Sequence, residues 1–297
     1  MLRRTLIGTA ALGLIAAAPP PPSKPATPMS VLAAALPADW SRIDPQDLLV
    51  IDLANGGRVA IALASAFAPV HIANIRTLAR AGWFDGLAID RVQDGYVTQW
   101  GDMEGTKPLS AGVVKPTPAE YERSAAGLSL AMLPYRDTFA PKTGYVGPFP
   151  VGADGGQAWL AHCYAMVGVG RENNPDTGTG AELYAVIGHA PRQLDRNIAL
   201  IGRVVDGMEQ LTALPRGGAD MGFYADPKQR TGIVRERIAA DLPAAERPAY
   251  EYLRPDSASY RAWQHVRANR QDDFYLRPAG AADLCGVLPP VRAVPRY

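Results

Sequence analysis

Short apolar runs suited to β-strands recur along most of the chain. Residues 48–53 and 58–63 are two such runs, and the Asn-Gly-Gly sequence between them is a hairpin signature. Further runs of the same kind lie at 164–169, 183–187 and 198–204. The pattern therefore predicts a protein built mainly from short strands.

Helical patterns are few by comparison. Ser65 and Pro69 open a partial apolar stripe that continues to about Arg80, which predicts one helix there. A second helix is predicted over residues 206–214, capped by Asp206 and stopped by Pro215. Many strands with two helices favour a closed β-barrel capped by helices over alternating βαβ units.

The first residues have the pattern of an export signal. A basic start with Arg3 and Arg4 precedes an apolar run of about 14 residues that ends in three alanines. A membrane-spanning helix needs roughly 20 apolar residues, so cleavage is favoured over a permanent anchor. We expect a signal peptide at 1–18, a proline-rich tether and lead-in at 19–44, and a periplasmic or secreted protein; an uncleaved membrane tether is the alternative.

Composition narrows the function further. The chain has 297 residues, 47% of them apolar, which is enough for a full core. Its formal net charge of +1 provides no basic field for nucleic acid. The four histidines are scattered and the two cysteines stand apart, so we expect neither a metal site nor a cofactor. In an exported chain Cys163 and Cys285 commonly form a disulfide, and two buried thiols are the alternative.

The stretch 86–102 carries the most distinctive chemistry, because Arg91 and Gln99 stand eight residues apart around an Asp-Gly turn. A three-residue loop at 93–95 places Arg91 opposite Val97, with Gln99 on the same face. A two-residue turn places Arg91 opposite Thr98 instead. The sequence leaves both registers open, and a slip of one residue reverses the face of every side chain.

Seven blocks of sequence, in this order, resemble those of the cyclophilins. They lie at 56–59, 68–74, 83–86, 91–102, 165–168, 180–184 and 194–208. The resemblance covers roughly residues 48–234. It implies a closed eight-stranded antiparallel barrel with a helix over each end, and peptidyl-prolyl cis-trans isomerase activity on its outer face. We expect a cyclophilin-like domain at 45–240, an insertion at about 103–148, and a C-terminal extension at 241–297 packed on the barrel.

The resemblance also assigns roles to individual residues. Arg91 is implied as the cation that hydrogen-bonds the prolyl amide as it leaves planarity, and Gln99 as the group that holds Arg91 and the substrate backbone. Such a cation stabilises the twisted amide more than the planar one. The implied peptide-binding residues are Tyr96, Val97, Gly168, Tyr184, Leu194 and Ile198. The expected partners are proline-containing unfolded or flexible polypeptides, with no nucleic acid and no stable membrane span after signal cleavage.

Several positions depart from the cyclophilin pattern. Gln193 stands where the family often has an aromatic residue and Ile198 where it has a histidine. Asparagine and glutamine of the family are replaced by Gly168 and Glu182, and a small glycine by Trp100. One wall of the pocket is therefore altered. A non-catalytic peptide-binding or chaperone module, or a structural envelope protein, is the alternative to an isomerase.

The insertion and the extension have weaker patterns. The insertion is rich in proline and glycine and contains one run typical of a strand, at 128–133. The extension contains an arginine-rich aromatic stretch at 260–275. With net charge near zero, this stretch is interpreted as a packed appendage rather than a nucleic-acid surface. His162, near the predicted site, is interpreted as a structural histidine.

Overall fold

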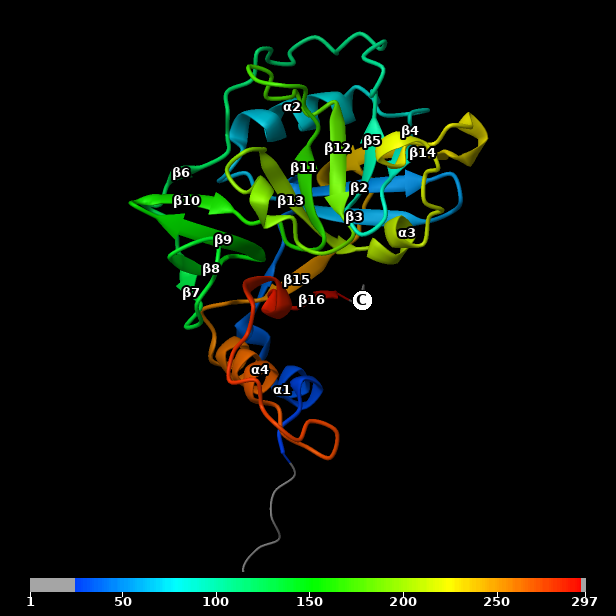
Figure 1. Ribbon diagram of the computed structural model, residues 1–297. Helices are drawn as coiled ribbons and strands as arrows, with labels where there is room; N and C mark the ends of the chain where they lie inside the picture. The colour runs from blue at the N-terminus through cyan, green and yellow to red at the C-terminus, as the bar shows by residue number, and fades with distance from the viewer. Residues whose placement is uncertain (1–24, 295–297) are drawn as a thin grey trace, which may run out of the picture.

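The computed structural model describes residues 25–294, and the predicted signal peptide at 1–18 lies outside them. Eight antiparallel strands close into a barrel in the order β11-β12-β5-β4-β14-β2-β3-β13 (Figure 1). They are β2 (Leu48–Leu53), β3 (Arg58–Leu63), β4 (Ala88–Val92), β5 (Val97–Gly101), β11 (Met166–Val169), β12 (Glu182–Val186), β13 (Leu200–Asp206) and β14 (Thr231–Ile238). The predicted closed eight-stranded barrel is confirmed.

Two helices pack on this barrel. Helix α2 (Pro69–Arg80) has the predicted bounds, and its residues Ile72 and Ile75 reach the barrel core. Helix α3 (Met208–Thr212) is shorter than predicted and contributes Leu211. The prediction that Asp206 caps it was wrong, because Asp206 ends β13 and Gly207, with a φ of 84°, stands before the helix.

The barrel interior is mainly apolar, and it contains a buried pair of Trp100 and Glu236. Trp100 on β5 is 1% exposed, and its Nε1 donates a hydrogen bond of 3.2 Å to Oε2 of Glu236 on β14. Glu236 is fully buried, and its Oε1 has no hydrogen-bond partner among the described residues. Burial raises the pKa of Glu236 to about 8, which the hydrogen bond from Trp100 only partly offsets.

The second half of the insertion predicted at 103–148, together with the residues that follow it, forms a second sheet. After the irregular residues 102–122, five strands pair in the order β6-β10-β9-β8-β7. They are β6 (Arg123–Ser124), β7 (Ala131–Met132), β8 (Lys142–Val146), β9 (Phe149–Asp154) and β10 (Gln157–Leu160). The strand predicted at 128–133 is reduced to the two residues of β7.

The lead-in and the C-terminal extension fold together. Strand β1 (Trp40–Arg42) pairs with β15 (Tyr250–Leu253), which also pairs with β16 (Val291–Ala293). Helix α1 (Pro28–Ala34) packs against α4 (Ala258–Asn269). The part of the predicted tether within the described residues thus has a packed partner in the extension (Figure 1).

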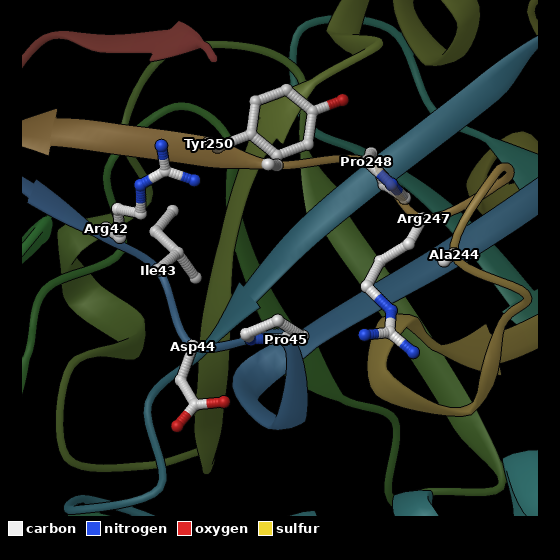
Figure 2. A pocket seen from close by; sticks show the side chains of 9 residues that line it. Arg42, Ile43, Asp44, Pro45, Ala244, Arg247, Pro248 and Tyr250 are labelled. Carbon is white, nitrogen blue, oxygen red and sulfur yellow. The ribbon is translucent and has the colours of Figure 1, made fainter. Parts of the chain in front are cut away.

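Short 3₁₀ helices connect these elements. They are η1 (Pro37–Asp39), η2 (Pro45–Asp47), η3 (Arg192–Leu194), η4 (Asp220–Gly222), η5 (Pro227–Gln229), η6 (Ala239–Asp241) and η7 (Leu284–Val287). A cavity of about 570 Å³ lies between residues 42–45 and 244–250, where the lead-in meets the extension. Figure 2 shows the side chains of Arg42 and Arg247 on opposite sides of this cavity.

A disulfide joins the C-terminal extension to the segment just before strand β11 of the barrel. Cys163, just before β11, is bonded to Cys285 in η7, with their Cα atoms 5.1 Å apart. The structure thus contains the disulfide rather than two free thiols. Within residues 25–294, no helix has both the length and the apolar character needed to cross a membrane.

Candidate active site

The hairpin of β4 and β5 adopts neither of the two predicted registers. Arg91 lies opposite Gln99, and the N–H of Gln93 donates a 2.9 Å hydrogen bond to the carbonyl of Val97. The loop therefore consists of residues 94–96, with Gly95 at a φ of +62°. The register shifts between Ile89 and Arg91. This bulge inserts one residue that the sequence pattern did not reveal.

Three hydrogen bonds fix the guanidinium of Arg91. Its Nε donates to the carbonyl of Met221 and its Nη1 to Oε1 of Gln99, both at 2.7 Å, and its Nη2 donates to Oε1 of Gln93. The ring of Phe223 lies 5.5 Å from the guanidinium carbon. Because arginine has five N–H donors, one on each terminal nitrogen is left for a ligand. Burial lowers the pKa of Arg91.

Gln99 connects Arg91 to the carboxyl group of Glu182, which the sequence analysis named as a departure in the pocket wall but not among the site residues. While its Oε1 accepts from Arg91, its Nε2 donates to Oε1 of Glu182 on β12. Burial raises the pKa of Glu182, opposed by the hydrogen bond from Gln99. The only signal in the sequence was that Glu182 replaces a glutamine of the cyclophilin pattern.

A cavity of about 110 Å³ opens beside Arg91 and Gln99. It brings together seven of the eight predicted residues: Arg91, Gln99, Tyr96, Val97, Tyr184, Leu194 and Ile198. Val169, Gly170 and Arg171 complete its lining. Beneath the cavity, Val97, Tyr184 and Val186 form a small buried cluster on the outer face of the barrel.

Gly168 itself is not among the residues that line the cavity, whereas its neighbours Val169 and Gly170 are. Gly168 is paired with Tyr184 across the two strands and lies under its ring. A Cβ atom at this position would come within 2.3 Å of the Tyr184 hydroxyl oxygen. The absence of a side chain thus makes room for Tyr184, and the cavity is lined by the next residues of the strand instead.

Tyr184 is held from behind by a buried histidine. Nε2 of His162 lies 2.9 Å from the Tyr184 hydroxyl, and Nδ1 lies 3.0 Å from Oδ1 of Asp195. The His162 side chain is 0% exposed, which agrees with its interpretation as structural. Burial raises the pKa of Tyr184 far above its ordinary value, so the phenol stays neutral.

The same hydrogen-bond network extends to Asp137, which lies between strands β7 and β8 of the second sheet. Arg192 donates from Nε to Asp195 at 2.6 Å, and from both terminal nitrogens to Asp137 at 3.0 and 3.1 Å. The Arg192 side chain is 3% exposed and the two carboxylates are nearly as buried. A residue of the insertion therefore supports the wall of the cavity through Arg192, Asp195 and His162.

Of the two wall positions where an aromatic residue and a histidine of the family are replaced, one lines the cavity and the other does not. Ile198 lines it, whereas Gln193, in η3, is exposed and does not. In the described part of the chain, no cluster of three or more histidine, cysteine, aspartate or glutamate residues has the arrangement of a metal site.

Comparisons with known proteins agree with this fold. The family model described as cyclophilin type peptidyl-prolyl cis-trans isomerase/CLD matches residues 48–237. Probable peptidyl-prolyl cis-trans isomerases of Brucella suis biovar 1 (strain 1330) and Brucella abortus (strain 2308) are 27% and 26% identical over 205 residues. Each alignment covers 68% of this chain and 87% of the relative.

The crystal structure of cyclophilin AquaCyp293 from Hirschia baltica has a similar fold. The two structures superpose with a TM-score of 0.68 at 23% identity. The match covers 91% of this chain and 98% of that chain. It therefore extends beyond the barrel into the parts that a minimal barrel lacks.

Proposed function

Because the chain belongs to the cyclophilin-type peptidyl-prolyl cis-trans isomerase family, we propose that the cavity beside Arg91 is its active site and that its substrates are exported polypeptides. The observation that carries the first part is the hydrogen-bonded row of Arg91, Gln99 and Glu182, whose first two members line the same cavity as several apolar side chains. This row places a fixed cation beside a surface that accepts a proline ring.

The reaction requires no covalent step. Rotation about a peptide bond meets a barrier of about 18–20 kcal/mol, which comes from the conjugation between the nitrogen and the carbonyl. When the prolyl amide twists, its nitrogen regains a lone pair that accepts a hydrogen bond. The two free N–H groups of Arg91 supply that bond, and it strengthens only as the amide twists.

The other residues keep the cation and the substrate in place. Arg91 is positioned by the carbonyl of Met221 and by Gln99, whose own amide is oriented by Glu182. A guanidinium held in this way needs little rearrangement when the amide twists, and such preorganisation is a large part of electrostatic catalysis. Val97, Tyr184 and Leu194 provide apolar contacts for the proline ring.

Export is supported by two features away from the site. The first residues have the basic and apolar pattern of a signal peptide. A disulfide between Cys163 and Cys285 is typical of proteins in oxidising compartments. We therefore propose a periplasmic or secreted isomerase that assists the folding of exported proteins.

A non-catalytic peptide-binding module is the second function we consider. It is favoured by the departures at the wall, where Ile198 lines the cavity and Gln193 is turned to solvent. Nothing in this alternative requires the hydrogen bonds of Arg91, because binding the ground state of a peptide needs mainly the apolar wall.

One experiment separates the two functions. Exchange between the cis and trans forms of a short prolyl peptide is measured by NMR with and without the purified protein. Line broadening at catalytic protein concentrations supports the isomerase. Binding without faster exchange supports the peptide-binding module. Intact-mass measurement of protein recovered from the native envelope tests export separately, and retention of Met1 in a soluble cytoplasmic fraction would contradict it.

A further inference from the structure

The loop that follows α4 presents three consecutive apolar side chains to solvent. Phe274 is 81% exposed, Leu276 is 76% exposed, and Tyr275 between them is 43% exposed. We call residues 274–276 the apolar tip. The loop lies at the end of the molecule remote from the barrel (Figure 1). Neighbouring exposed apolar groups commonly mark an interaction surface.

The backbone of the tip is held by specific contacts. Oδ1 of Asp272 accepts hydrogen bonds of 2.9 Å from the N–H groups of both Phe274 and Tyr275. Arg270 donates from Nε to Oδ2 of Asp272 at 2.6 Å, and its guanidinium carbon lies 4.3 Å from the centre of the Tyr275 ring. The exposure of Phe274 is thus built into an ordered turn.

We propose that the apolar tip inserts into the interface of a lipid bilayer. Phenylalanine, tyrosine and leucine are the side chains that amphipathic interfacial segments bury at this depth. The charged residues from 270 to 277 are two arginines and two aspartates, so their charges cancel. Attraction to anionic headgroups therefore contributes little, and the affinity comes from transfer of the apolar side chains.

The position of the tip favours a membrane over a protein partner. The described chain begins at Pro25, just before α1, and α1 packs against α4 at this same end (Figure 1). The preceding sequence carries the basic and apolar pattern of a membrane-targeting leader. The tip therefore lies at the end of the molecule that this leader, before its cleavage, brings to the membrane. Insertion leaves the barrel and its cavity facing away from the lipid.

Tryptophan fluorescence tests the proposal on the full chain. Phe274→Trp introduces an indole at the tip, and Val234→Trp, at a position 58% exposed on β14, introduces a matched indole on the barrel. Each variant is mixed with phosphatidylcholine vesicles whose acyl chains are brominated, which quench indoles that enter the lipid. The emission of the unsubstituted protein is subtracted. The comparison also controls for vesicle binding through the N-terminal apolar segment, because that binding brings both variants to the vesicle without placing either added indole in the lipid.

The expected result is quenching of the added indole at 274 and none at 234. Adding Leu276→Ser to the Phe274→Trp variant should weaken vesicle partitioning of the tip about tenfold, because it removes one apolar side chain from the lipid. Raising the salt concentration should leave the quenching unchanged. The proposal is overturned if the indole at 274 is not quenched, which leaves the tip as a surface for a protein partner, or if both positions are quenched equally.

Discussion

Replacing the buried Glu236 by glutamine should remove a large part of the pH dependence of folding. Glu236 lies inside the barrel against Trp100, and its pKa is raised from 4.5 to about 8. Between these two values the folded protein keeps the proton and the unfolded chain releases it. The unfolded state then binds fewer protons, so stability is greatest below pH 4.5 and falls as the pH rises toward 8.

The magnitude follows from the size of this shift. Each pH unit in that window costs about 1.4 kcal/mol, so the loss reaches about 3 kcal/mol by pH 7. Glu236→Gln never ionises, yet it retains an oxygen that accepts from Nε1 of Trp100. The variant should therefore be more stable than the wild type at neutral pH and nearly equal to it in acid.

Urea unfolding at pH 5 and pH 7.5 measures this difference. The stability gap between Glu236→Gln and the wild type should widen by about 3 kcal/mol from the lower to the higher pH. The exposed Glu209, on α3, supplies a matched control, since Glu209→Gln should give the same small effect at both values. A gap for Glu236→Gln that does not change with pH would refute the reasoning.

Three further predictions concern the site and the disulfide. His162→Ala should raise KM for prolyl peptides about tenfold with little change in kcat, since the Tyr184 hydroxyl loses the hydrogen bond that holds its ring in place. His162→Gln should recover part of the loss in steady-state assays. Glu182→Gln should lower kcat/KM about threefold. In the wild type, kcat/KM should fall in acid as Glu182 takes up a proton, at a pH above the ordinary carboxyl range because the pKa of this group is raised, and this fall should be absent in the variant. Replacing both Cys163 and Cys285 by serine opens a loop with a sequence separation of 122 residues, which should lower the free energy of unfolding by up to about 4–5 kcal/mol in denaturant titrations.

Local signals explain the elements that the sequence predicted well. The hairpin of β2 and β3 and the helix at 69–80 have the predicted bounds, because an Asn-Gly-Gly turn and a proline at the first helical turn act on neighbouring residues. Arg91 and Gln99 share a face as expected, but the loop lies at 94–96 rather than 93–95, so Arg91 pairs with Gln99, and a bulge follows Ile89. A single extra residue leaves no clear mark on a short apolar run.

Contacts between distant segments explain what the sequence did not predict. The second sheet is built from strands of two to six residues interrupted by glycine and proline, so no single strand has a strong pattern. The chain from Asp137 through Arg192 and Asp195 to His162 forms only after the insertion packs on the barrel. Likewise, the sequence shows Glu182 as a departure from the cyclophilin pattern. Its hydrogen bond with Gln99, however, forms only because β5 pairs with β12.

The most direct test of the account is the rate of prolyl isomerisation by Arg91→Ala. Its kcat/KM, measured by NMR exchange on a prolyl peptide, should fall by about two to three decades, or roughly 3–4 kcal/mol, because the lost contact forms mainly in the twisted state. Peptide affinity should fall much less, and Arg261→Ala, at an exposed arginine on α4, should match the wild type. Wild-type kcat/KM in Arg91→Ala would contradict the claim that this guanidinium carries the reaction.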